Sequence, residues 1–174
     1  MNQKLKWISS CGGPFILTTK STALNWLGID GVSARESVGC NNDYEIACQV
    51  IDLVGKIHGS PNEILVMGDL PNDLAWVRRS DEEGLIVKWI GADSDEQVLN
   101  SLQDVNFDNF KILPLSIEFE ETELLMFDSA SKFNEIEDNY LQISLKPGEY
   151  KISFIDFQPN ENIWLHLFHL KRNL

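Results

Sequence analysis

The sequence predicts an α+β protein that is predominantly antiparallel β, with two or three short helices in its N-terminal half. Short runs of β-branched and aromatic residues, bounded by Gly, Pro, Asn and Asp, recur along the 174 residues. Apolar residues at helical spacing occur only before about residue 105, and from Phe107 onward the hydrophobic period is two. We therefore expect a single domain over residues 1–174, the alternative being an α+β lobe at 1–105 and an all-β lobe at 106–174.

The first elements expected are two strands and a brief helix. The strands, Lys4–Ser9 and Phe15–Thr19, are joined as a hairpin by the turn residues Cys11–Pro14. A helix is predicted at Ser21–Leu27, and residues 28–42 have the composition of a loop.

A more convincing helix is predicted to begin at Asp43, as its cap, and to end near Gly55. Its apolar residues leave only a narrow polar stripe, so we expect it to be mostly buried against a sheet. The face expected to be buried contains Tyr44, Ala47, Cys48, Ile51 and Val54. In this position Cys48 would act as a small hydrophobic residue.

Three strands and a second capped helix complete the first part of the chain. The strands are expected at Glu63–Met67, Leu74–Arg79 and Leu85–Ile90. A turn at Gly68–Pro71 follows the first of them. Ser94 is placed to cap the helix, with Gln97 in the position of a capping box.

Only strands and loops are predicted after Phe107. The strands are expected at Ser116–Glu120, Leu124–Phe127, Tyr140–Leu145, Tyr150–Phe154 and Asn162–Leu170. Residues 129–139 form a polar loop. Pro147 and Gly148 favour a tight turn, which predicts a hairpin between the two strands that flank them.

The net charge of −13 indicates the kind of partner to expect. The excess is spread evenly, at −7 over residues 1–106 and −6 over residues 107–174. Such a field repels nucleic acid and anionic membranes and accelerates encounter with a basic protein. We therefore expect neither a nucleic-acid nor a membrane partner. Solubility alone is the alternative explanation.

Several features favour the cytoplasm as the location of the protein. No apolar run approaches the roughly 18 residues that span a membrane, and no signal-peptide core follows the basic N-terminus. Three cysteines, an odd number without CxxC spacing, are typical of reduced thiols.

No motif indicates a metal, a cofactor or a covalent mechanism, so we predict none of these. His166 and His169 lie three apart in a strand-like segment, where their side chains point to opposite faces, and His58 has no ligand spacing around it. We expect them to be surface or edge histidines. Cys11 is best explained as a turn residue. The chain also lacks a nucleophile elbow and both glycine-rich phosphate motifs.

The candidate site is an acidic cluster formed by Glu118, Glu120, Glu121 and Glu123. A solvated face explains such a cluster, and a partner-binding patch is the functional interpretation. A pair of catalytic carboxylates of the glycosidase type stays open as a further alternative. We rank the binding patch above catalysis.

The five tryptophans are expected to be core anchors, and one that proved exposed would be a candidate for a binding hot spot. They are Trp7, Trp26, Trp76, Trp89 and Trp164. With 43% hydrophobic residues the chain can bury a sizeable interior.

Six segments in a fixed order combine turn residues with apolar anchors and contain no active-site chemistry. They are Trp7–Leu17, Asp43–Cys48, Gly68–Pro71, Gly84–Trp89, Asp128–Ala130 and Leu145–Tyr150. As a series they resemble the immunity protein 21 family of bacterial polymorphic toxin systems, over about Trp7 to Leu170. We assign their turn residues to folding rather than to contacts.

The resemblance implies a non-enzymatic cytoplasmic protein that binds a cognate toxin and blocks its active site. A toxin with a basic catalytic domain, such as a nuclease, would fit the acidic charge, and acidic side chains would then take the place of phosphates. Two alternatives come from other classes. One is an unrecognised carboxylate-based hydrolase, and the other is a general acidic interaction or nucleic-acid-mimic module. The oligomeric state is not predicted.

Overall fold

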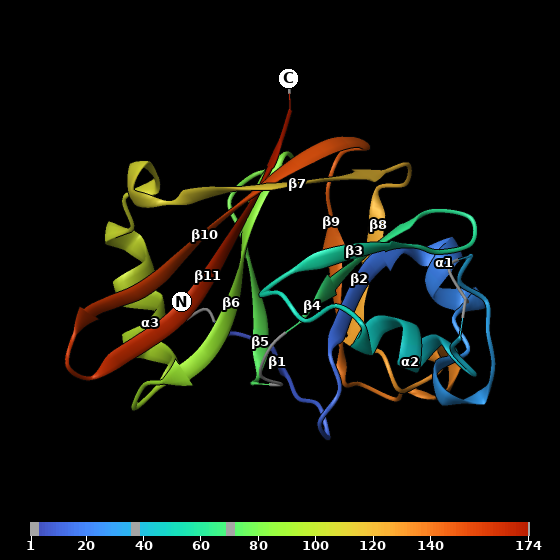
Figure 1. Ribbon diagram of the computed structural model, residues 1–174. Helices are drawn as coiled ribbons and strands as arrows, with labels where there is room; N and C mark the ends of the chain where they lie inside the picture. The colour runs from blue at the N-terminus through green and yellow to red at the C-terminus, as the bar shows by residue number, and fades with distance from the viewer. Residues whose placement is uncertain (1–3, 36–38, 69–71, 174) are drawn as a thin grey trace.

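Two antiparallel sheets pack face to face, and helical segments cover the outer face of each sheet (Figure 1). The computed structural model describes residues 4–35, 39–68 and 72–173. No helix within these ranges is both long enough and apolar enough to cross a membrane.

The larger sheet has six strands, and β11 lies inside it between β6 and β10. Across the sheet the order is β1 (Trp7–Ile8), β5 (Leu74–Arg78), β6 (Glu83–Gly91), β11 (Ile163–Arg172), β10 (Gly148–Asn160) and β7 (Lys111–Phe119). The strands β10 and β11 form a long hairpin, with paired residues from Tyr150 and Arg172 to Asn160 and Ile163.

The smaller sheet has five strands, with β2 in the middle. Its order is β3 (Gly55–His58), β4 (Glu63–Met67), β2 (Phe15–Thr19), β8 (Glu123–Asp128) and β9 (Tyr140–Ser144).

The core lies between the sheets and continues on the other side of the smaller one. Along β8, Leu124 and Met126 face the six-stranded sheet, whereas Leu125 and Phe127 pack under the helices. Both faces of β8 are therefore covered, which explains why its sequence is continuously apolar rather than alternating.

Helices supply the two outer layers. The helices α1 (Lys20–Asn25) and α2 (Asp43–Cys48) cover the five-stranded sheet together with the buried Trp26. The helix α3 (Asp95–Ser101) covers the six-stranded sheet through Val98, and Leu102 follows it into the same cluster. Short 3₁₀ turns lie at Gly28–Asp30, Leu102–Asp104, Phe107–Asn109 and Phe133–Glu135.

The predominantly antiparallel β prediction is confirmed, but the helices are not confined to the N-terminal half. The helix α3 begins at Asp95, beyond the midpoint of the chain, and 3₁₀ turns follow it. Each sheet contains strands from both sides of residue 105, which meet where β6 pairs with β11 and where β2 pairs with β8. The single domain over residues 1–174 stays a prediction.

Both predicted hairpins are wrong, because each turn carries the chain from one sheet to the other. The turn at Cys11–Pro14 links β1 of the larger sheet to β2 of the smaller one. Pro147 and Gly148 lead from β9 to β10, and Gly148 pairs with Phe119 of β7. Turn residues indicate where the chain reverses, but they do not identify the strand that it then pairs with.

The helix predicted from Asp43 to about Gly55 ends at Cys48. Its N-cap is Asn42, whose side chain accepts from the backbone N–H of Glu45 at 2.8 Å. Cys48 is exposed and Ile51 is 87% exposed, so neither belongs to a buried face. The residues after the helix lead into β3, which the sequence did not predict because the apolar spacing of α2 continues to Val54; its four residues pair with the next strand, β4.

Candidate functional site

The four predicted glutamates lie around the β7–β8 turn, but they do not form one surface. Glu118 and Glu120 are exposed, whereas Glu121 and Glu123 are half-buried and bound to the protein itself. The sequence could not show which of these carboxylates face inward, and the role of the cluster in binding stays a prediction.

Glu121 binds the first turn of α1. Its Oε2 accepts from the backbone N–H of Ser21 at 3.3 Å, and its Oε1 accepts from the hydroxyl of Ser21. The N-cap residue of α1, Thr19, makes no side-chain capping bond, and the first turn contains no acidic residue of its own. Glu121 therefore supplies the negative charge that favours a helix N-terminus, which is a structural role.

Glu123 is used in a similar way. It pairs with Lys20 at 3.1 Å and accepts a hydrogen bond from Gln142 at 2.9 Å. The lysine belongs to α1 and the glutamine to β9, so Glu123 links elements on either side of β8. This leaves Glu118 and Glu120 as the carboxylates available to a partner.

The surface around Glu118 contains further acidic residues. Glu149 lies directly opposite Glu118 across β7 and β10, and both are exposed. Like charges in directly paired positions destabilise a sheet, and a basic partner would relieve the repulsion. Glu63 lies on the other side, where its Oε2 accepts from the backbone N–H of Glu118 at 3.1 Å. We call Glu63, Glu118, Glu120 and Glu149 the acidic patch.

Hydrogen bonds keep two members of the acidic patch ionised. Partial burial opposes ionisation of Glu63, but the hydrogen bonds from Lys56 and from the Glu118 backbone hold its pKa below the usual value. Hydrogen bonds from Asn173 and Ser116 lower the pKa of Glu149. A general acid needs a raised pKa, so these shifts are opposite to those of a glycosidase-type acid.

A small polar hollow of about 210 Å³ lies beside the acidic patch. Arg35 and His58 line it together with Glu63, Glu118 and Glu120. The backbone N–H of Arg35 donates to the carbonyl of His58 at 2.9 Å, which joins the loop before α2 to β3. The mixture of charges is suited to contact with polar side chains of another protein.

The histidines do not form a metal site. No group of three or more His, Cys, Asp or Glu side chains in the described ranges is placed to hold a metal ion. His166 packs against Phe154, whereas His169 packs against Phe107 in the layer of α3, so the expectation of opposite faces is confirmed.

The expectation of surface or edge histidines is wrong for His169. It lies on an interior strand, is 6% exposed and approaches Glu83 at 3.1 Å. Burial lowers its pKa, although the hydrogen bond to Glu83 acts in the opposite direction.

The turn that contains Cys11 is held by Asp128 and serves the fold. Oδ2 of Asp128 accepts from the hydroxyl of Ser10 at 2.7 Å and from the backbone N–H of Cys11 at 3.3 Å. A Cβ atom on Gly13 would lie 2.5 Å from the ring of Tyr44, so only glycine fits there. Two of the six segments singled out in the sequence, Trp7–Leu17 and Asp128–Ala130, thus meet in space.

The expectation that the tryptophans are mainly core anchors is confirmed for four of them, which lie in or pack against the core, and Trp164 is the exception. Trp26 is 1% exposed, and its indole N–H donates to the carbonyl of Ser129 at 2.8 Å. Trp164 is 44% exposed. The sequence predicts that Trp164 lies in a strand. It does not indicate which part of that strand the second sheet leaves uncovered.

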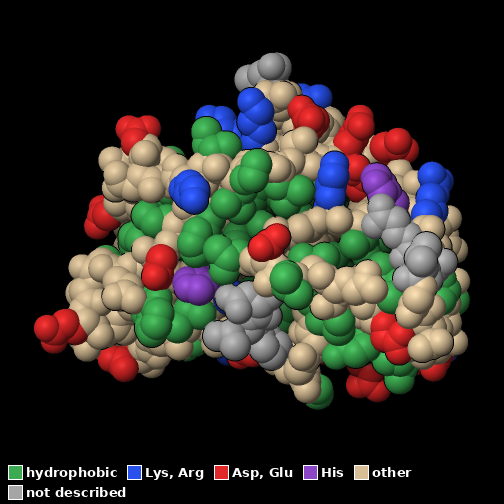
Figure 2. Space-filling model, viewed as in Figure 1, with side chains coloured by type: hydrophobic (Ala, Val, Ile, Leu, Met, Phe, Trp, Pro, Cys, Tyr) green, Lys and Arg blue, Asp and Glu red, His purple; other side chains and the backbone are tan. Residues whose placement is uncertain are grey.

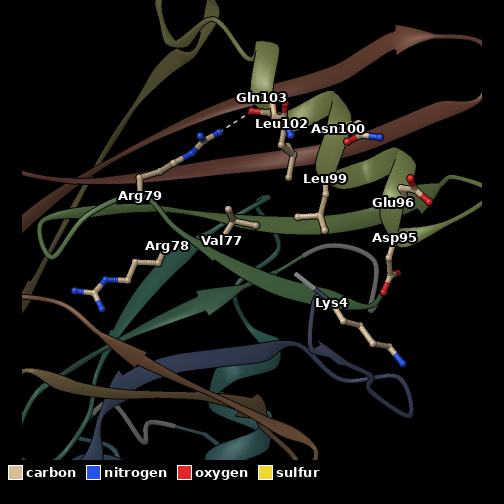
Figure 3. Close-up of a pocket in the computed structure, with 10 residues that line it drawn as sticks. All are labelled: Lys4, Val77, Arg78, Arg79, Asp95, Glu96, Leu99, Asn100, Leu102 and Gln103. Atoms are coloured by element: carbon tan, nitrogen blue, oxygen red, sulfur yellow. Dashed lines mark hydrogen bonds between the residues drawn. The ribbon is translucent and has the colours of Figure 1, made fainter. Parts of the chain in front are cut away.

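A groove of about 780 Å³ lies between β5 and α3 (Figure 3). Arg79 extends toward the end of α3, where it donates to the carbonyl of Leu102 at 2.7 Å, while Arg78 and Lys4 point away from the helix. Asp95 accepts from the indole of Trp7 at 2.9 Å. These groups serve internal contacts or diverge, so the groove lacks the convergent polar groups of a catalytic pocket.

Hydrophobic side chains form a band across the face of the molecule seen in Figure 2, with charged side chains around it. Three residues that pack against the core between the sheets are only half-buried, so part of their apolar surface is exposed: Leu113, Leu115 and Phe154. An apolar centre with a charged rim is the usual anatomy of a protein-binding surface.

Comparison with known protein families gives one finding. The family model described as Immunity protein 21 matches residues 6–163. Comparison with curated proteins and with solved structures gives no match.

Proposed function

The chain belongs to the Immunity protein 21 family, and on this premise we propose that it binds a cognate bacterial toxin domain and neutralises it by covering the active site. Family membership indicates an immunity protein of toxin systems, a class of inhibitors rather than enzymes. The lowered pKa values of Glu63 and Glu149 support a binding role for the acidic patch in place of acid catalysis.

We propose further that the toxin domain is basic and acts on nucleic acid. The support is the net charge of −13, together with two directly opposed carboxylates, Glu118 and Glu149, on an exposed part of the sheet. The latter observation carries this part of the proposal, because two ionised carboxylates in directly paired positions attract a cationic side chain of a partner. Acidic side chains would then occupy positions that phosphates take in the substrate.

We propose the bacterial cytoplasm as the place where the inhibitor acts. The three cysteines are free thiols, which fits a reducing compartment. Fractionation of cells that express the tagged protein at its native level tests this, and recovery outside the cytoplasm would contradict it.

Capture of the tagged protein from its own host tests the main proposal. Washes at low and then high salt are followed by mass spectrometry, and the retained partner is expressed and assayed with the purified protein. We expect one stoichiometric toxin that resists high salt and loses activity at a 1:1 ratio. A mixture of basic proteins removed by salt would contradict the proposal, since it would indicate charge alone.

Charge reversal at the acidic patch predicts a kinetic effect. We expect Glu118→Lys with Glu120→Lys to slow toxin association about tenfold at low salt and to flatten its salt dependence. Stopped-flow measurement over a range of ionic strengths reads both effects. Glu121 is left unchanged, because its carboxylate binds α1.

A matched control separates local from overall charge. Asp104→Lys with Glu137→Lys changes the net charge by the same amount at two exposed positions away from the β7–β8 turn. The control is expected to slow association less than twofold. Equal slowing by both double variants would remove the acidic patch from the interface.

A further inference from the structure

The inner face of the six-stranded sheet extends beyond the sheet that covers it. Tyr150 and Ile152 on β10 and Phe168 on β11 are buried between the two sheets. Farther along the same face of this hairpin, the side chains become half-buried or exposed: Phe154, Asp156, His166 and Trp164. This uncovered end of the face includes the exposed tryptophan.

Contacts within the hairpin hold Trp164 in one position. Its indole Nε1 donates to Oδ1 of Asp156 at 2.6 Å. Asp156 is paired with His166 across the hairpin, and the Nε2 atom of His166 lies 3.8 Å from the same carboxylate oxygen. The ring of His166 packs edge-on against Phe154, which in turn contacts the buried Phe168. The tryptophan is thus connected to the core and loses little freedom on binding.

The space beside the Trp164 ring is open. Trp164 lies opposite Gly91 of β6, and a Cβ atom on that glycine would meet no atom within 4 Å. The side chain of Asp156 is 52% exposed, and only Oδ1 is used by the indole. An aromatic face next to a carboxylate with an exposed oxygen is suited to a guanidinium group, which can stack on the ring and donate a hydrogen bond to the carboxylate at the same time.

We propose that Trp164 and Asp156 form the anchor for an arginine side chain of the toxin domain. This inference rests on the proposed function and identifies one contact of that complex. The acidic charge of the chain complements such a partner, and tryptophan is the residue type most enriched among binding hot spots. The acidic patch and the anchor have separate kinetic roles, since steering charges act on association and a packed anchor acts on dissociation.

Binding of the cognate toxin to the intact protein gives the first test. We expect Trp164→Ala to weaken binding at least 30-fold, through faster dissociation. Asp156→Asn should weaken binding about fivefold, and Trp164→Phe should retain part of the affinity. Ile112→Ala is the control, because Ile112 is 71% exposed on the opposite face of the sheet. If Trp164→Ala bound the toxin with an affinity within twofold of wild type, the proposed anchor would be overturned. Thermal melting verifies that the variant is folded.

A second test does not depend on the toxin. N-acetylarginine amide is titrated into the ¹⁵N-labelled protein, and the indole signal of Trp164 is identified as the one lost in Trp164→Phe. We expect this signal to shift with arginine, and not with the neutral isostere N-acetylcitrulline amide or in Asp156→Asn. Equal shifts with both amides, or none with arginine, would overturn the anchor. Failure of any toxin to bind wild type would instead overturn the proposed function, and the titration would still decide on the arginine site.

Discussion

Asp43 is completely buried, and its carboxylate organises the loop that precedes α2. Oδ1 accepts from the backbone N–H groups of Ser33 and Ala34 at 2.7 and 2.9 Å, and Oδ2 accepts from Leu27 N–H at 2.9 Å and from the Ser33 hydroxyl at 2.5 Å. A buried carboxylate is tolerated when such donors replace its water. The loop is therefore fixed in place over the outer face of the five-stranded sheet.

Replacing this carboxylate by an amide should destabilise the fold. Asp43→Asn keeps the shape but turns an NH₂ group toward backbone donors, so we expect a loss of about 3 kcal/mol in the free energy of unfolding. Urea unfolding followed by tryptophan fluorescence measures it. Asp52→Asn, at an exposed position, is the control and should change the free energy by less than about 0.5 kcal/mol. A similarly small change for Asp43→Asn would show that the hydrogen bonds accepted by the Asp43 carboxylate do not contribute to stability.

At the scale of elements, α1 depends on a residue about 100 positions away. Six residues are too few for a helix to be stable alone, and Glu121 provides the carboxylate at its N-terminus. The β7–β8 turn and α1 are thereby joined, which keeps Glu118 and Glu120 in a defined place at the surface.

We expect Glu121→Ala to lower the free energy of unfolding by about 1 kcal/mol, the usual effect of removing a helix cap. Glu120→Ala, next to it but exposed, should have almost no effect on stability. Both variants are compared by urea unfolding and by toxin association. Slower association of Glu121→Ala without any loss of stability would show that Glu121 is a contact and not a cap.

Elements set by local chemistry could be predicted from the sequence. The strand Glu63–Met67 is found as expected, and Ser94 caps α3 by accepting from the backbone N–H of Gln97 at 3.3 Å. Turn residues, caps and alternation act over a few positions, so they can be read directly. The predicted turn at Gly68–Pro71 includes residues 69–71, which lie outside the described residues.

Features that depend on distant partners could not be predicted. The pairing of β1 with β5 and the inward direction of Glu121 follow from contacts tens of residues apart. The Trp164–Asp156 pair is close in the sequence but was missed because it requires the register of the β10–β11 hairpin, whose strands were not paired in the prediction. The acidic cluster was found, but its division into bound and free carboxylates was not.

At the scale of the whole molecule, the shifted pKa values predict a loss of stability on acidification in two stages. Burial lowers the pKa of His169 in the folded state. As the pH falls below about 6.5, the unfolded chain therefore binds a proton at His169 before the folded protein does. Stability due to the neutral imidazole is present above that pH and is lost below it. The pKa values of Glu63, Asp81 and Glu149 are also lowered, and the stability that these carboxylates contribute is lost at pH values below about 4.5.

Unfolding free energies measured between pH 4 and 8 check this profile. We expect stability to fall between pH 7 and 5 in wild type and to be flatter over this range in His169→Asn, whose side chain does not titrate. A wild-type curve that rises toward pH 5 would contradict the direction of the His169 shift. An unchanged slope in the variant would assign the loss to other groups.

The position of β11 inside the six-stranded sheet determines when during synthesis the larger sheet can be completed. β11 is the strand that joins β6 to β10, so the two halves of the larger sheet are linked only after Arg172 has left the ribosome. A nascent copy therefore has neither the packed sandwich nor the hairpin that bears Trp164 and Asp156. Under the proposed function, only molecules in which β11 has entered the sheet would present the Trp164–Asp156 anchor to a toxin.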